Sequence, residues 1–266
     1  MNERKIVEMY ESGISSPQIA KQKGVATHKI AYILHKNKVK MRSTPNKKRK
    51  YIIKNNDIFE TIDTQEKSYW LGFLMADGYL NSSSPQIGLT LGKADEGHLE
   101  KFKLFLDTNY PIRTYKGTSY TTNEYCRIIM TSRKMKKDLI NKGMTENKTL
   151  TLDKPKNLPK ELEIHFIRGF FDGDGTLTSA YNRGPGGAWN IKITSTEGIL
   201  NFIKSYFGKE ELSLYHKKGT SEKTFTLTLA GNLQVEKILD EMYKDSTVHL
   251  DRKYEKYIEF KNSRLL

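Results

Sequence analysis

The sequence contains little cysteine and no long apolar run. Its single cysteine, Cys126, excludes a disulfide framework and a cysteine-rich zinc site, and it fits a reducing compartment. The six histidines are scattered without the spacing of metal ligands. The apolar run at 70–76 is far shorter than the roughly 20 residues of a membrane span. The N-terminal segment MNERKIVEMYESG carries charges where a signal peptide has its apolar core, so we expect a cytoplasmic protein with no membrane partner.

Acidic residues are also few relative to basic ones. The chain has 45 Lys and Arg against 31 Asp and Glu, and 45 − 31 leaves a net charge of +14. Residues 1–56 hold 14 of the basic and 3 of the acidic residues, or +11, and the remaining chain holds 31 and 28, or +3. A local basic density of this kind favours a polyanion, nucleic acid first and an anionic membrane second. The alternative is a solvated, charge-rich surface.

The first 42 residues have the pattern of three short helices. The spacing predicts helices over 3–12, after Ser15 or Ser16, and over 27–36, with a turn at Gly24. This order is typical of a helix-turn-helix domain, although a small three-helix bundle with a solvated basic face has the same pattern. In a helix-turn-helix domain the exposed side of the last helix would meet a major groove. Its candidate DNA-binding residues are Thr27, His28, Lys29, Tyr32 and Lys36. Residues 43–56 contain a basic run and little apolar content, which predicts a linker.

The remaining chain is duplicated. YWLGFLMADGYL at 69–80 is similar to FIRGFFDGDGTL at 166–177, and each segment heads the same series of predicted elements. The series is an apolar helix ending in Asp-Gly, a strand, a helix, two more strands and a last helix. The predicted strands are 87–91, 112–115 and 125–131 in the first half, and 191–194, 212–216 and 224–229 in the second. We therefore expect an α+β fold built as a tandem repeat, with the first repeat at 57–156 and the second at 157–266.

The residues of the two duplicated segments themselves indicate a helix pair that ends at a cation. Gly72 and Gly169 lie within apolar helices, where glycine costs about 1 kcal/mol relative to alanine, so a close backbone contact is the expected compensation. That contact would bring Asp77 and Asp174 together at the helix C-termini. Two carboxylates beside helix-end carbonyls are costly without a cation, so we expect Mg²⁺, which takes oxygen ligands. An Asp-Gly turn after a helix is the alternative for either copy alone.

The motifs LGFLMADG and RGFFDGDG resemble those of the LAGLIDADG homing endonucleases, and two of them on one chain resemble the monomeric, two-repeat members. The resemblance covers 57–266. It implies a pseudo-twofold saddle of antiparallel strands with helices behind, preceded here by the small all-α helix-turn-helix domain. It also implies two or more divalent ions, a double-stranded DNA partner and no obligate protein partner.

The resemblance also assigns site residues. It makes Asp77 and Asp174 the metal-binding catalytic pair, and Ala76 and Gly173 the positions whose carbonyls can also face metal. Asp172 matches the earlier acid of the motif, but the first copy has Met75 there, which indicates that this acid is dispensable and has a structural role. Two further positions, Lys148 and Lys253, resemble the family's pocket lysines, expected here after the last helix of each repeat; a surface lysine is the alternative.

The predicted saddle would present alternating strand residues to DNA. The candidates are Arg113, Lys116, Arg127, Lys192, Lys217, Lys218 and Lys223. The resemblance implies a site-specific, metal-dependent endonuclease that cuts both strands and leaves 3′ overhangs. The alternative is a non-cleaving DNA-binding regulator or an RNA-splicing maturase on the same fold.

Overall fold

The computed structural model describes residues 2–42, 50–117, 123–146, 148–180, 188–216 and 221–264. The chain divides into two compact units, residues 1–50 and 51–266, and each has its own buried core. Among the described residues, no helix combines the length and the apolar character that crossing a membrane requires.

The N-terminal unit consists of α1 (Glu3–Glu11), α2 (Ser16–Lys23) and α3 (Thr27–Lys36). The Gln18 side chain accepts a hydrogen bond from the Ser15 backbone N–H, which caps the start of α2, and Gly24 ends α2 in the left-handed conformation, with φ of 62°. The three helices bury a small apolar core between them. The three predicted helices are therefore present, with the predicted turn.

The second unit begins within the predicted linker, at Tyr51. Of the linker residues, 43–49 lie outside the described part of the chain. Residues 51–56 belong to the second unit, because Ile53 pairs with Thr108 and the Lys54 N–H donates to the Asp107 carbonyl at 3.1 Å. Ile53 also packs against the core of the second unit.

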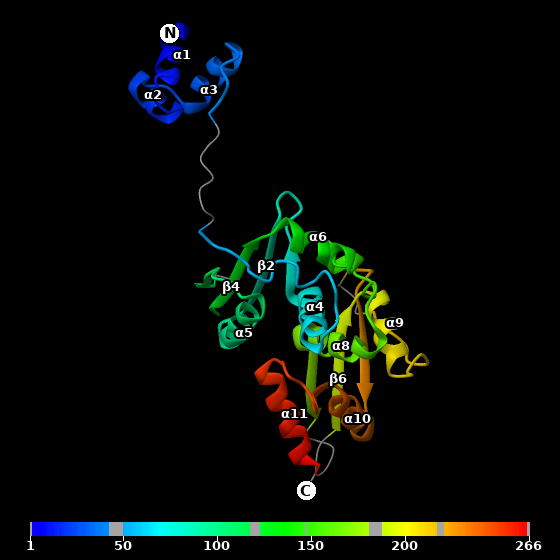
Figure 1. Cartoon of the computed structure of the whole chain (residues 1–266). Helices are drawn as coiled ribbons and strands as arrows, with labels where there is room; N and C mark the ends of the chain where they lie inside the picture. The colour runs from blue at the N-terminus through cyan, green and yellow to red at the C-terminus, as the bar shows by residue number, and fades with distance from the viewer. Residues whose placement is uncertain are drawn as a thin grey trace. The chain divides into compact units, whose positions relative to one another are not determined.

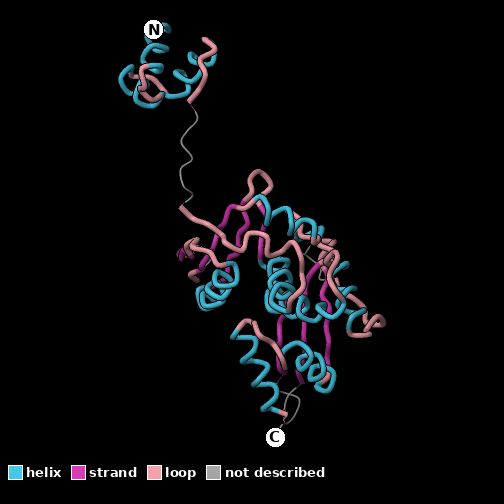
Figure 2. Tube along the Cα trace, in the orientation of Figure 1, coloured by secondary structure: helices cyan, strands magenta, loops and turns pink. Residues whose placement is uncertain are grey.

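The second unit contains two antiparallel sheets, which Figure 2 shows in magenta. The first has the order β1-β2-β4-β3 and the second the order β5-β6-β7. The strands of the first sheet are β1 (Gly78–Leu80), β2 (Gln86–Gly92), β3 (Ile112–Tyr115) and β4 (Tyr125–Thr131). Those of the second are β5 (Gly175–Ala180), β6 (Ala188–Ser195) and β7 (Phe225–Ala230). Side chains alternate along β4, where Cys126, Ile128 and Met130 are buried and their neighbours are not, so one face of the sheet packs on helices and the other is open.

Helices cover the inner faces of these sheets. The pair α4 (Gln65–Asp77) and α8 (Glu163–Asp174) lies side by side in Figure 1, and each packs on the first strands of its own repeat. The other helices of the second unit are α5 (Glu96–Leu106), α6 (Arg133–Asn141), α7 (Lys148–Thr151), α9 (Glu197–Tyr206), α10 (Asn232–Tyr243) and α11 (Asp251–Ser263). Helix α5 packs on β2 and β4, and α9 and α10 pack on β6 and β7, so each repeat is α+β as predicted.

One predicted strand was wrong. Residues 212–216 do not form a strand; Tyr215 alone makes an isolated bridge with Thr226. The Leu212 N–H donates instead to the Lys209 carbonyl, three residues earlier, so the chain turns where the sequence predicted extension.

Candidate active site

The active site is organised by the contact between α4 and α8. A Cβ atom added to Gly72 would lie 2.1 Å from the Phe166 carbonyl oxygen, and one added to Gly169 would lie 2.0 Å from that of Tyr69. Both distances are far inside van der Waals contact, so only glycine allows the two backbones to approach this closely. This is the helix contact that the sequence predicted.

The same contact brings the two motif acids together. Asp77 is the last residue of α4, and Asp174 is the last residue of α8. A Cβ atom on Gly173 would lie 2.4 Å from the Ala76 Cβ and 3.3 Å from Asp77 Oδ2, so the end of one motif touches the end of the other. Two carboxylates therefore share one small region at the C-termini of two helices.

The electrostatics of this region disfavour two ionised acids. Burial and, second to it, the Asp174 charge raise the pKa of Asp77 to about 6, although the charges of Lys148, Lys253 and Arg252 act in the opposite direction. Burial also raises the pKa of Asp174, which nevertheless keeps exposed surface that a cation can reach. Perturbed carboxylates of this kind are typical of functional sites.

Two lysines complete the site, of which Lys148 is half-buried and Lys253 is buried. Lys148, at the start of α7, donates to the Met75 carbonyl at 3.2 Å, and burial lowers its pKa. The Nζ of Lys253 donates to the carbonyl oxygens of Phe171 and Gly175, at the end of α8, and burial lowers its pKa to about 8. The sequence placed both lysines after the last helix of each repeat, but they lie within two helices, α7 and α11, that it did not predict.

The residues at this site fit a hard divalent cation. Within the part of the chain that the structure describes, no three His, Cys, Asp or Glu side chains gather as a closed metal site. Asp77 and Asp174 supply two carboxylates whose raised pKa values a nearby cation would lower. Mg²⁺ is commonly held by one or two carboxylates and otherwise by water and substrate phosphate oxygens. A site with two protein carboxylates and open positions meets that description.

Because the pKa of Asp77 is raised in the folded protein, its ionised side chain destabilises the fold when no cation is bound. Its pKa is about 6 in the folded protein against an ordinary value of 3.8, so falling pH favours folding through this window and neutral pH opposes it. Asp77→Asn removes the charge, and we expect the free energy of unfolding at pH 7.5 in EDTA to rise by roughly 1–3 kcal/mol. Urea unfolding measures this difference, which should shrink towards pH 4. A less stable variant at pH 7.5 would contradict the placement of this carboxylate.

The predicted DNA-facing residues of the strands lie on open surface where they are described. Arg113 on β3 stands directly opposite Arg127 on β4, whose Nε donates to Thr90 Oγ1 at 2.8 Å and whose guanidinium lies 5.4 Å from the Tyr125 ring centre. In the second sheet Lys192, on β6, is exposed and has a threonine opposite it on each neighbouring strand, β5 and β7. Lys116 and Lys223 are exposed beside strand ends, while Lys217 and Lys218 lie outside the described residues.

The predicted surface of α3 is partly as expected. Thr27, His28 and Lys29 are exposed, and Tyr32 is 69% exposed. Lys36 is different, because its Nζ lies 2.9 Å from Glu3 Oε1 and so ties α3 to α1. Lys36 therefore stabilises the N-terminal unit in addition to being a candidate DNA-binding residue.

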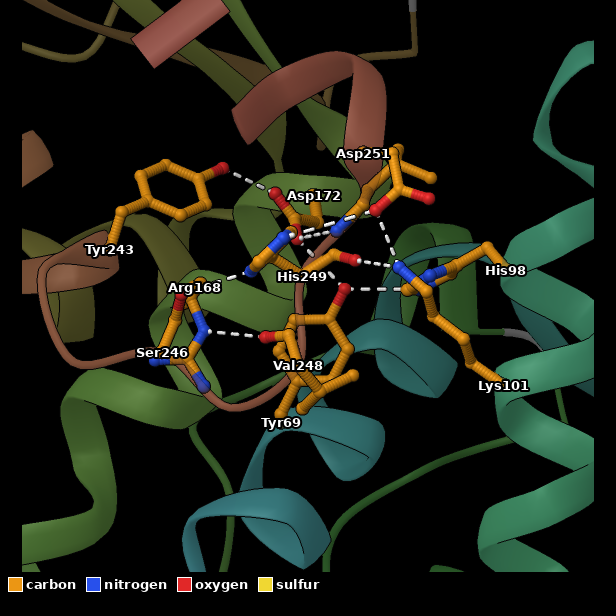
Figure 3. Close-up of polar contacts among 11 residues, drawn as sticks. Tyr69, His98, Lys101, Arg168, Asp172, Tyr243, Ser246, Val248, His249 and Asp251 are labelled. Atoms are coloured by element: carbon orange, nitrogen blue, oxygen red, sulfur yellow. Dashed lines mark hydrogen bonds and ion pairs between the residues drawn. The ribbon is translucent and has the colours of Figure 1, made fainter. Parts of the chain in front are cut away.

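Sequence reasoning missed a buried polar network around Asp172, shown in Figure 3. Asp172 is fully buried and accepts hydrogen bonds from the hydroxyls of Tyr69 and Tyr243 and from the Leu250 N–H. The buried Arg168 donates to the carbonyls of Val248 and Met242. One signal for this network was present in the sequence. The second motif helix carries charged residues, Arg168 and Asp172, at two otherwise apolar positions that are uncharged in the first repeat.

Comparison with solved structures identifies the fold of the second unit. No protein-family model matches this chain, and no curated protein matches it. Among solved structures, the I-LtrWI LAGLIDADG homing endonuclease bound to target DNA is 14% identical, with 78% of this chain and 89% of that one aligned at a TM-score of 0.50. Meganuclease I-SmaMI bound to uncleaveable DNA is also 14% identical, over 73% of this chain and 88% of its own, at a TM-score of 0.48. Residues 51–266, with their paired motif helices and two sheets, therefore have the fold of the LAGLIDADG homing endonucleases.

Proposed function

We propose that this protein is a site-specific, Mg²⁺-dependent endonuclease of the homing type that cuts both strands of DNA and leaves 3′ overhangs. The observation that carries the proposal is the pair Asp77 and Asp174 at the joined ends of two helices, with raised pKa values and two lysines beside them, one half-buried and one buried. A helix pair with a purely structural role would not need this arrangement, because carboxylates with raised pKa values lower the free energy of unfolding at neutral pH.

The protein residues have distinct roles in this proposal. Asp77 and Asp174, with the carbonyls of Ala76 and Gly173, would hold two or more divalent ions, which supply an activated water and stabilise the leaving oxygen. Lys148 and Lys253 lie beside the ends of the two motif helices, where their ammonium groups are suited to orient water and to stabilise the charge that develops on the phosphate.

The open faces of the two sheets are the proposed DNA-binding surface. Arg113 and Arg127 face each other in register without a carboxylate partner among the described ion pairs, an arrangement that is unfavourable until an anion binds. DNA phosphates and guanine edges are such acceptors. The relative I-LtrWI was solved with its target DNA, which supports a double-stranded DNA partner. One chain carries both motifs, so we propose that it acts as a monomer inside the cell.

The N-terminal unit is proposed to add affinity for DNA as a helix-turn-helix domain. Replacing Thr27, His28 and Lys29 together with alanine should weaken DNA binding about tenfold and reduce the log–log salt slope by about 1, because one phosphate-binding cation is removed. The cleavage rate at saturating protein should not change, since these residues lie outside the unit that holds the active site. A salt titration and a footprint of the variant beside the wild type measure this. An unchanged slope and footprint would mean that the unit is a solvated bundle.

The test of the proposed function is cleavage of DNA that the protein itself selects. Duplexes bound by the wild-type protein are enriched from a randomised library, incubated with Mg²⁺ or with EDTA, and sequenced at their ends. We expect staggered ends with 3′ overhangs in Mg²⁺ only, and sedimentation near the 30.7 kDa of one chain. Selective binding without cleavage in any divalent metal would instead favour a regulator, and selective binding of RNA would favour a maturase.

A further inference from the structure

The segment between α10 and α11, residues 244–250, is held by polar groups from both repeats. In Figure 3, Asp172 is the centre of these contacts. Its Oδ2 accepts from the Leu250 N–H at 2.7 Å and from the Tyr69 hydroxyl at 2.7 Å, and its Oδ1 accepts from the Tyr243 hydroxyl. All three donors are directed at one buried carboxylate, so each of its oxygens has a defined partner.

Other side chains fix the rest of the segment. Arg168 Nε donates to the Val248 carbonyl at 3.1 Å, and Gln65 Oε1 accepts from the Thr247 N–H at 2.7 Å. Gln65 belongs to α4 of the first repeat and Arg168 to α8 of the second. The connection is therefore set by the same helix pair that carries Asp77 and Asp174.

The segment leads directly to one of the two active-site lysines. Leu250 is the N-cap residue of α11, and its carbonyl accepts from the Lys253 N–H at 2.9 Å. The amide that Asp172 holds is thus one helical turn away from Lys253. Next to it, Arg252 Nε lies 2.9 Å from Asp95 Oδ2, which attaches the start of α11 to the first repeat as well.

Among the described residues, no buried carboxylate holds the segment of the other lysine, Lys148, in this way. Met75 stands in the first motif where Asp172 stands in the second, and a thioether cannot replace a carboxylate that accepts three hydrogen bonds. Lys148 lies on a four-residue helix, and within the described part of the chain it donates to the Met75 carbonyl. The polar network therefore serves one half of the active site.

We propose that Asp172 is a positioning residue that acts through the Leu250 N–H to hold the start of α11, and so keeps Lys253 at the end of α8. For its effect on cleavage this inference rests on the proposed function, since Lys253 matters to DNA only if the site cuts it. Each repeat contributes one lysine beside its own motif helix, so loss of Asp172 should slow the cutting of one strand and spare the other.

The first test is independent of DNA. The full-length wild type, Asp172→Ala and Asp172→Asn are treated briefly with acetic anhydride, and acetylation of each lysine is followed by mass spectrometry. Lys253 should react at least tenfold faster in Asp172→Ala, whereas Lys148 should not change. Asn keeps an acceptor for Leu250, and the tyrosine hydroxyls can accept from its amide, so Asp172→Asn should label much as the wild type does. Unchanged labelling of Lys253 in Asp172→Ala would overturn the proposal.

The second test uses the selected duplex with each strand end-labelled separately. Asp172→Ala should slow one strand at least tenfold and accumulate nicked DNA, and Asp172→Asn should largely restore double-strand cutting. Asp138→Ala is the matched control, because Asp138 is also a buried carboxylate but pairs with Lys134 on α6. Equal slowing of both strands by Asp172→Ala would contradict a role specific to Lys253.

These outcomes separate this inference from the proposed function. If the wild type cuts no DNA, the proposed function fails, while the acetylation result still decides whether Asp172 positions Lys253. Asp172→Ser is the second variant if Asp172→Ala does not fold. Unfolding of both would mean that Asp172 supports the whole fold, which also contradicts the proposal.

Discussion

Replacing either Asp77 or Asp174 with asparagine is expected to lower the rate of double-strand cleavage by at least about a thousandfold and to leave DNA affinity within about threefold. Asparagine keeps the size of the side chain but lacks the charge that holds a divalent cation. The two acids lie at the joined ends of α4 and α8, and neither substitution alters the basic strand residues, such as Arg113 and Arg127, that we propose bind DNA, so binding should survive.

The measurement is a time course of cleavage of the selected duplex, with affinity from a gel shift in Ca²⁺ or EDTA. Asp57→Asn is a suitable control, because Asp57 is an exposed carboxylate outside both motifs, and the variant should cut at the wild-type rate. Full cleavage by the double variant Asp77→Asn and Asp174→Asn would remove the basis of the proposed function. A loss of binding equal to the loss of cleavage would place the acids in recognition instead.

The features that the sequence predicted correctly depend on local pattern or on duplication. Gly72 and Gly169 were recognisable because glycine is unfavourable in an apolar helix and because the two segments repeat each other. Strands β2, β3 and β4 were predicted to within a residue at each end, since alternation of apolar residues marks a sheet with one buried face.

Helix α11 was missed because its buried positions are not all apolar. Its sequence, DRKYEKYIEFKNS, is dominated by charge, and its buried residues are Lys253, Tyr257 and Phe260. The spacing of these three is helical, but the first is a lysine whose amine donates to two carbonyls, one in the last turn of α8 and one at the start of β5. Only tertiary structure supplies those acceptors, so pattern reasoning places the lysine on the surface.

The Asp172 network could not be predicted for a related reason. Its donors are Tyr69, Tyr243 and the amide of Leu250, which are separated from Asp172 by 103, 71 and 78 positions in the sequence. The sequence indicated a structural role for Asp172 from the methionine in the other repeat, and the structure agrees with that prediction. Which groups it would bind depends on how α10 and α11 fold back onto the helix pair.

Alanine at Gly72 or Gly169 is expected to be strongly destabilising. The new methyl carbon would lie 2.1 Å or 2.0 Å from a carbonyl oxygen of the facing helix, and backbone atoms cannot move aside as a flexible side chain can. Inserting a methyl group into a packed core typically costs 1–3 kcal/mol, and here the two helices must separate, so we expect the free energy of unfolding to fall by roughly 3 kcal/mol or more. For a unit of this size that corresponds to a decrease in Tm of at least about 6 °C.

Thermal and urea unfolding of the full-length protein measure this effect, and Gly97→Ala provides the matched control. Gly97 is also a helical glycine, in the first turn of α5, but a Cβ atom there would meet nothing within 4 Å. Alanine is the better helix former, so this variant should be as stable as the wild type or more stable by up to about 1 kcal/mol. The contact at Gly72 and Gly169 also sets the positions of Asp77 and Asp174. The folded fraction of each alanine variant should therefore cleave bound DNA more slowly than the wild type does. Equal stability of Gly72→Ala, Gly169→Ala and Gly97→Ala would show that the helices do not pack backbone to backbone, and would remove the geometric basis of the active site.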